Sequence, residues 1–240
     1  MNNAILSPSE DLNYYFRSAF SVTCVIFGVD EKAIKVLVVK RQKEPYKGFY
    51  ALPAGMVYPN DSIEERVDTI VKEVTGTSRF YKKQIRAFTD KSRHPLGRVI
   101  SIGYYSFVNI AECNLQQGNL ESESIWIDLK SVPELAFDHN EIVQAAKRRL
   151  LAKLSTQLAG FEMLSEKFTL KQLQEMYEAA LGHELDKRNF RRKILSQDVI
   201  VETGELLTPW DESGKAPMLY KLNRELYDNR RAAGDHFEIF

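Results

Sequence analysis

Residues 187–193 carry the side chains of this sequence that are best suited to binding a polyanion. They read Lys-Arg-Asn-Phe-Arg-Arg-Lys, so five of the seven are basic. On a helix, Phe190 and Ile194 would share the buried face, and Arg188 and Arg192 would point away from it. Arginine pairs with guanine and asparagine with adenine in the major groove, whereas other basic side chains suit phosphates. The predicted contacts to double-stranded DNA are Lys187, Arg188, Asn189, Arg191, Arg192 and Lys193, with Lys215 from a later loop.

Two other interpretations of this basic segment remain open. A run of charge is often a solvated helix face, and a basic helix can also bind an acidic protein partner. The whole chain has 33 basic and 33 acidic residues, so the cluster does not follow from a basic composition. Half of the ten basic residues of the region 161–225 lie in these seven positions, which favours DNA. Binding that is insensitive to salt would instead indicate a protein partner.

The elements around the basic segment predict a winged helix. Thr169 and Gln172 form a capping box that starts one helix, and a second helix follows over residues 186–196. Thr203-Gly204 separates two short apolar runs and predicts the turn of a hairpin. A last strand is expected at Met218–Leu222. Two helices joined by a turn and followed by a hairpin and a strand have the order of a winged helix-turn-helix domain.

The first half of the chain shows an α+β pattern. Strands are predicted at 20–29, Ala33–Lys40, 85–88, 99–110 and 124–129, with a loop at 45–56. A helix is predicted over 62–75, because Ser62 and Glu65 form a capping box and Gly76 supplies a stop. A further helix is expected after Pro133, with Asp138 and Glu141 as its capping box and Phe137 with Ile142 as its hydrophobic staple.

The segment that leads into the 62–75 helix resembles the box of the Nudix family. The positions of that box that this chain keeps are Gly55, Asp61, Val71, Glu73 and Gly76. Thr69, Ile70 and Val74 stand where the family has an arginine and two glutamates. Magnesium needs several oxygen ligands, which isoleucine and valine lack. We therefore expect no metal, no catalytic residues and no Nudix hydrolase activity.

A Nudix-like domain joined to a winged helix resembles the Nudix-related transcriptional regulators. Three segments carry this resemblance: 90–101, 136–142, and 168–170 together with 188–193. It implies an α+β chain with a Nudix-like α/β/α sandwich over 1–155, including a linker helix from about 138, and a winged helix-turn-helix domain over 156–240. It also implies a homodimer on a palindromic operator and no cofactor. We place the domain boundary near 154–161.

The chain looks most like the arabinose-responsive branch of that family, which occurs in Bacteroidetes. The resemblance predicts a repressor of sugar utilisation that L-arabinose releases from its operator. A pocket without metal-binding carboxylates also suits a neutral sugar better than a pyrophosphate. The alternatives are a regulator of NAD metabolism that responds to ADP-ribose and, third, a Nudix hydrolase.

The effector contacts expected from the usual Nudix pocket come from two loops and two strands. A sugar needs hydrogen-bond donors and an aromatic wall. The candidates are Phe20, Arg41, Lys43, Tyr46, Phe49, Lys91 and His94. Each is individually more often an ordinary surface or packing residue, and His139 is interpreted as part of a helix cap.

Composition adds two exclusions. Cys24 and Cys113 are too few for a disulfide framework and lack metal-ligand spacing. No run of residues is long and apolar enough for a membrane span, and the first residues lack the order of a signal peptide. We therefore expect a cytoplasmic protein that does not bind membranes.

Overall fold

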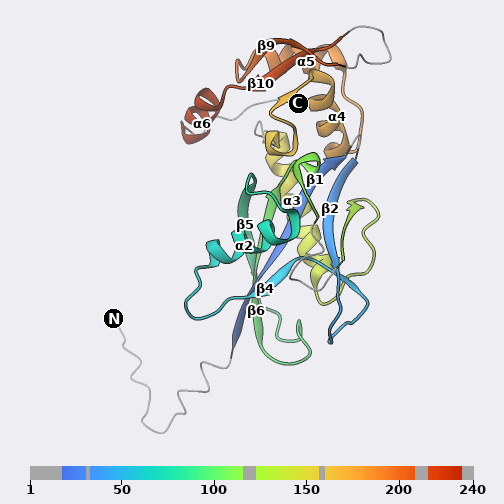
Figure 1. Ribbon diagram of the computed structural model, residues 1–240, viewed down its shortest axis with the longest axis vertical. Coiled ribbons are helices and arrows are strands. Elements are labelled where there is room, and N and C mark those ends of the chain that lie inside the picture. Colours follow the sequence, from blue (N-terminus) through green and yellow to red (C-terminus); the bar gives the residue numbers. More distant parts are fainter. Residues whose placement is uncertain (1–17, 31–32, 116–122, 157–159, 209–215, 234–240) are drawn as a thin grey trace.

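The computed structural model describes residues 18–30, 33–115, 123–156, 160–208 and 216–233 of the chain (Figure 1). These residues form a seven-stranded and a three-stranded sheet. The strands of the larger sheet are β1 (Ala19–Asp30), β2 (Ala33–Lys40), β3 (Tyr50–Ala51), β4 (Ala54–Met56), β5 (Tyr81–Phe88), β6 (Val99–Phe107) and β7 (Ser124–Asp128). Among the described residues, no helix is both long and apolar enough to cross a membrane.

The larger sheet is built around β1. Its main path runs β3-β2-β1-β6-β5, while β4 pairs with β1 and β7 with β2. The β1–β6 pair is parallel, with Ala19 opposite Val99 and Phe27 opposite Phe107. The other pairs in this sheet are antiparallel. Residues 21–28 of β1 are all buried, as expected for a central strand covered on both faces.

Alternate residues of β1 pack against different helices. Cys24 shares a core with the buried face of α2 (Ile63–Thr75). Phe27 shares another core with α3 (His139–Thr156). Because side chains of a strand alternate between the faces of its sheet, the two helices cover opposite faces, and Figure 1 shows α2 in front and α3 behind. The predicted α/β/α sandwich is confirmed.

The C-terminal region forms the predicted winged helix. Its elements are β8 (Lys167–Phe168), α4 (Leu170–Leu181), α5 (Lys187–Leu195), β9 (Ile200–Leu206), β10 (Met218–Leu222) and α6 (Arg224–Ala233). The small sheet has the order β8-β10-β9. Short 3-10 turns, η1 (Ile110–Glu112) and η2 (Phe161–Met163), lie in the connections. The domain boundary stays a prediction.

The core that contains α3 continues into the winged helix. Leu150 and Leu154 near the end of α3 belong to the same buried cluster as Leu173 and Tyr177 of α4. Asn109 donates a hydrogen bond to Ser165 across the same junction, with 3.3 Å between Nδ2 and Oγ. The two regions are therefore packed against each other and not merely joined by a linker.

Two capping boxes are confirmed and one is wrong. Ser62 and Thr169 each cap their helix through a complete box. The Asp138 carboxylate instead accepts hydrogen bonds from Arg93, and the Glu141 carboxylate accepts one from Arg86. The expected staple is also wrong, because Phe137 packs in the core on the α2 side and Ile142 in the core on the α3 side.

Two further local predictions differ from the structure. The predicted turn at Thr203-Gly204 lies inside β9, where Gly204 has a φ of 75° and the register with β10 shifts. This is a β-bulge, for which glycine at positive φ is also typical. The hairpin joins β9 to β10 instead. The expected loop 45–56 contains the short strands β3 and β4, because the backbone at 54–56 pairs with β1.

Candidate effector pocket and DNA-binding helix

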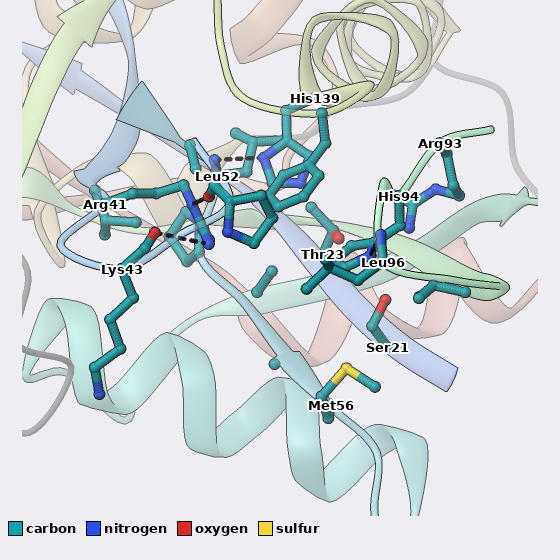
Figure 2. A pocket seen from close by; sticks show the side chains of 18 of the residues that line it. Ser21, Thr23, Arg41, Lys43, Leu52, Met56, Arg93, His94, Leu96 and His139 are labelled. Carbon is teal, nitrogen blue, oxygen red and sulfur yellow. Dashed lines mark hydrogen bonds between the residues drawn. The ribbon is translucent and has the colours of Figure 1, made fainter. Parts of the chain in front are cut away.

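A cavity of about 580 Å³ opens where β1, the segment after β2, the loop before β6 and the start of α3 meet (Figure 2). Its volume falls in the usual range for small-molecule sites. The residues that line it are Ser21, Thr23, Val39, Arg41, Gln42, Lys43, Glu44, Pro45, Ala51, Leu52, Pro53, Ala54, Gly55, Met56, Arg93, His94, Leu96, Val99, Phe137 and His139.

One wall of the cavity is basic. The Arg41 guanidinium donates to the backbone oxygens of Pro45, at 2.8 Å, and Lys43, at 3.3 Å, and lies 4.8 Å from the centre of the Phe137 ring. Burial lowers the pKa of Arg41, although nearby Glu44 opposes this. Lys43 and the acidic Glu44 line the cavity beside Arg41. Arg41 is thus held in place by neutral carbonyl groups and can attract an anionic ligand.

Two hydroxyl side chains add neutral polar groups to the cavity. Ser21 and Thr23 project from β1 on the same face of the sheet, two residues apart. The Thr23 and Ser101 hydroxyls share a buried hydrogen bond of 2.8 Å. Hydroxyl groups of this kind can both donate to and accept from a ligand.

Phe137 organises the aromatic side of the cavity. The His94 ring stacks on it with 5.1 Å between ring centres, and Tyr46 meets it edge-on at 4.8 Å. Phe137 and Tyr46 both have left-handed backbone conformations, with φ values of 59° and 64°. Such conformations are costly for bulky residues and cluster at functional sites. Both strained backbone positions therefore lie at or next to the cavity wall.

His139, expected to be part of a helix cap, is instead a buried wall of the cavity. Its Nδ1 accepts a hydrogen bond of 2.9 Å from the Leu52 backbone N–H (Figure 2). Burial lowers the pKa of His139 to about 3, with Asp138 opposing the shift and Arg93 and Arg41 adding to it. The ring is therefore neutral at physiological pH. The sequence offers no local signal for this role, because Leu52 lies on a distant segment.

The seven predicted effector residues divide into two groups. Arg41, Lys43 and His94 line the cavity. The cavity lining does not include Phe20, Tyr46, Phe49 or Lys91, so for these four residues effector contact stays a prediction. Phe20 is 48% exposed because its neighbour Ser21 takes the cavity face of β1. Tyr46 and Phe49 pack against each other at the rim, and Lys91 is exposed on its loop. Sequence reasoning missed Ser21, Thr23, Arg93, Phe137 and His139.

The face of α2 that carries Ile70 and Val74 is part of the core. Ile70 and Val74 are each 1% exposed. Among the described residues, no group of three or more His, Cys, Asp or Glu side chains could hold a metal ion. Gly55 lies beneath the Arg66 guanidinium, whose Nη2 would be only 2.6 Å from a Cβ at that position. An arginine thus packs on the glycine that begins the Nudix-like box.

α5 presents the predicted basic face. Asp186 caps the helix by accepting from the Asn189 backbone N–H at 2.7 Å, and Phe190 and Ile194 are buried. Arg188, Asn189 and Arg192 are exposed, as the helical spacing predicts. Arg192 donates to the Asn189 side chain at 2.8 Å. Lys187 is exposed, Arg191 and Lys193 are half-buried, and Lys215 lies outside the described residues.

Residues 160–222 match the NrtR DNA-binding winged helix domain. The "ADPR responsive transcriptional repressor NtrR" of Acinetobacter baylyi is 30% identical over 213 residues, which are 87% of this chain and 83% of that protein. The chain belongs to the NrtR family. This NrtR-family chain also resembles NrtR of Shewanella oneidensis, crystallised in complex with a 27mer DNA. The two have a TM-score of 0.76 and 29% sequence identity, and the match covers 87% of this chain and 95% of the Shewanella chain.

Two comparisons concern the Nudix-like region of this NrtR-family chain. The Nudix domain of Shewanella oneidensis NrtR, solved with ADP ribose, has a TM-score of 0.52 and 27% identity over 62% of this chain and 99% of that one. An ADP-ribose pyrophosphatase of Methanocaldococcus jannaschii is 36% identical over 117 residues, which are 49% of this chain and 68% of that enzyme. The interpretation as an arabinose-responsive regulator of carbohydrate use is therefore wrong. The Acinetobacter relative is an ADP-ribose-responsive repressor, and the Shewanella domain was solved with ADP ribose bound.

Proposed function

We propose that this chain is a transcriptional repressor whose affinity for operator DNA is controlled by ADP-ribose. The observation that carries the proposal is the exposed Arg188–Asn189–Arg192 face on α5, in a chain that matches DNA-bound NrtR over most of its length. Arg188 and Arg192 contact bases, and Lys187, Arg191 and Lys193 contact phosphates. The protein acts as a homodimer on a palindromic site.

The basic residues of the cavity suit ADP-ribose even without a metal-binding site. The basic wall formed by Arg41 and Lys43 can neutralise phosphate charge directly, since arginine binds phosphate through paired N–H donors. The name of the Acinetobacter relative and the ADP-ribose complex of the Shewanella domain support the same effector.

α3 links the cavity to the DNA-binding region. It begins at His139 in the cavity wall and ends among residues that share a core with α4. A ligand shifts a conformational equilibrium only when it binds one state better than the other. In this proposal, ADP-ribose favours a position of α3 and the winged helix that fits the operator poorly, and the repressor leaves the DNA.

Hydrolysis of ADP-ribose is the second candidate function, and the Methanocaldococcus relative is the observation that favours it. We propose that this chain does not hydrolyse the ligand. Ile70 and Val74 replace two carboxylates of the family box and are buried, so they offer no ligands to a metal ion. Water activation and charge stabilisation by magnesium are then lost.

Calorimetric titration of the purified protein with ADP-ribose tests the effector. The titration is run with magnesium and again with EDTA, and the ligand is recovered afterwards for chromatography. We expect binding of equal strength in both buffers and recovery of intact ADP-ribose, with ribose 5-phosphate as the control that lacks the pyrophosphate. No binding overturns the effector, whereas magnesium-dependent release of AMP and ribose 5-phosphate identifies a hydrolase.

A further inference from the structure

His139 presents one of its two ring nitrogens to the cavity. Its Nδ1 is occupied as an acceptor of the Leu52 N–H. A neutral imidazole has one acceptor nitrogen and one protonated donor nitrogen, so the proton must be on Nε2. The fixed hydrogen bond therefore selects the tautomer, as second partners of histidine commonly do.

The position of the ring makes this donor available to a ligand. His139 is 3% exposed, yet it lines the cavity. Among the described residues, no hydrogen bond is formed by Nε2. Nε2 is also absent from the set of unpaired polar atoms that are fully enclosed by protein, so it is open to the cavity. A buried N–H that faces a cavity gains more from a ligand acceptor than an N–H in water does.

The surroundings keep the ring uncharged. Asp138 is adjacent in sequence, but its carboxylate is bound by the Arg93 guanidinium at 2.8 and 2.7 Å. Arg41 faces the same cavity, as do Lys43 and Glu44 from the loop after β2, and His94 from the loop before β6. Burial is the main cause of the low pKa of the ring, and Arg93 and Arg41 add to it while Asp138 opposes it. His139 is therefore a donor of a neutral hydrogen bond rather than a cation.

We propose that His139 is a specificity-determining contact of the effector site, donating from Nε2 to a hydroxyl oxygen of a ribose ring. This inference rests on the proposed function and extends it to one subsite. The neutral donor and the Ser21 and Thr23 hydroxyls form a region suited to sugar hydroxyls, whereas Arg41 and Lys43 form the region suited to phosphates. A site that hydrogen-bonds a hydroxyl rejects ligands that lack it, because the buried donor would otherwise stay unpaired.

Two isosteric variants separate the ligand contact from the structural one. In His139→Asn the amide oxygen can replace Nδ1 and keep the Leu52 N–H paired, but no donor reaches the Nε2 position. In His139→Gln the amide reaches the Nε2 position and leaves the Leu52 N–H without its partner. We expect His139→Asn to weaken ADP-ribose binding about tenfold with little change in melting temperature, and His139→Gln to lower the melting temperature more.

Nitrogen-15 NMR of the full-length protein measures the tautomer directly, with or without ligand. A proton on Nε2 that changes its chemical shift when ADP-ribose is added is the expected result. A proton on Nδ1, or wild-type affinity in a folded His139→Asn variant, overturns the contact alone. If the wild type itself does not bind ADP-ribose, the proposed effector and this contact are both overturned.

Discussion

The Arg93 guanidinium donates two hydrogen bonds, 2.8 and 2.7 Å long, to the two carboxylate oxygens of Asp138. The pair joins the loop before β6 to the residue that precedes α3. The side chains are 4% and 15% exposed, so the ion pair is largely removed from water. Asp138 is thereby held by a partner 45 residues away and does not cap its own helix. The pair fixes the start of α3 at the edge of the cavity.

Arg93→Met is expected to destabilise the protein by about 3 kcal/mol, because it leaves the Asp138 carboxylate buried without its partner. The measurement is the free energy of unfolding in urea. Arg86→Met is the matched control, since the Arg86–Glu141 pair is half-exposed and should be worth about 1 kcal/mol or less. Equal losses in the two variants would show that the Arg93 pair has no special role.

Arg188→Ala and Arg192→Ala are each expected to weaken operator binding by about 1–3 kcal/mol, because each exposed guanidinium can contact a base. Fluorescence anisotropy with a duplex selected from a random library by the wild-type protein measures this. Lys130→Ala removes an exposed charge from the Nudix-like region and should leave the affinity unchanged. Wild-type affinity in both arginine variants would mean that α5 is not the recognition helix.

The pH dependence of stability should carry a contribution from His139. Its folded pKa is about 3, and an unfolded histidine titrates near 6.5. As the pH falls below about 6.5, the unfolded chain binds a proton at this residue and the folded chain does not, so stability is lost with decreasing pH. At pH 5 this loss is about 2 kcal/mol. Urea unfolding at pH 7.5 and pH 5 should show a smaller decrease for His139→Asn, and identical decreases would contradict the assignment.

Restoring a carboxylate to the Nudix-like box should harm folding without creating activity. Val74→Glu places a charge in the core beneath α2 and is expected to cost at least about 3 kcal/mol. Glu73→Gln changes an exposed residue of the same helix and should alter neither stability nor ADP-ribose affinity, with magnesium or with EDTA. Loss of ligand binding in EDTA would show that a metal takes part after all.

The sequence predicts elements whose signals are local. Ser62 and Thr169 each form a capping box with the residue three positions later in the sequence. The exposed face of α5 follows from the spacing of the buried Phe190 and Ile194. Asp138 has the same local pattern, but its carboxylate accepts hydrogen bonds from Arg93 and not from the backbone N–H groups of its own helix. Local pattern therefore predicts a cap well only where no buried partner from another segment needs the same carboxylate.

The cavity was harder to predict because it is made from segments that meet only in the folded chain. The place of Arg41 and Lys43 after a strand predicts that they lie at the cavity, and both line it. Phe20 is adjacent to a lining residue but does not line the cavity, because it is Ser21 whose side chain points inward from β1. The sequence predicts only a helix cap at His139, since nothing near this residue in sequence indicates the hydrogen bond from the Leu52 N–H. The predicted sugar effector is wrong, because the residues at the box positions alone do not reveal the basic side chains of Arg41 and Lys43 that line the cavity.

Release of DNA by the effector tests the central claim most directly. The complex of wild-type protein with its selected duplex is followed by anisotropy while ADP-ribose is added, with AMP and ribose 5-phosphate as controls. We predict that ADP-ribose dissociates the complex at concentrations near its calorimetric dissociation constant and that the controls do so much less. A complex that stays intact when the protein is saturated with ADP-ribose would contradict the account.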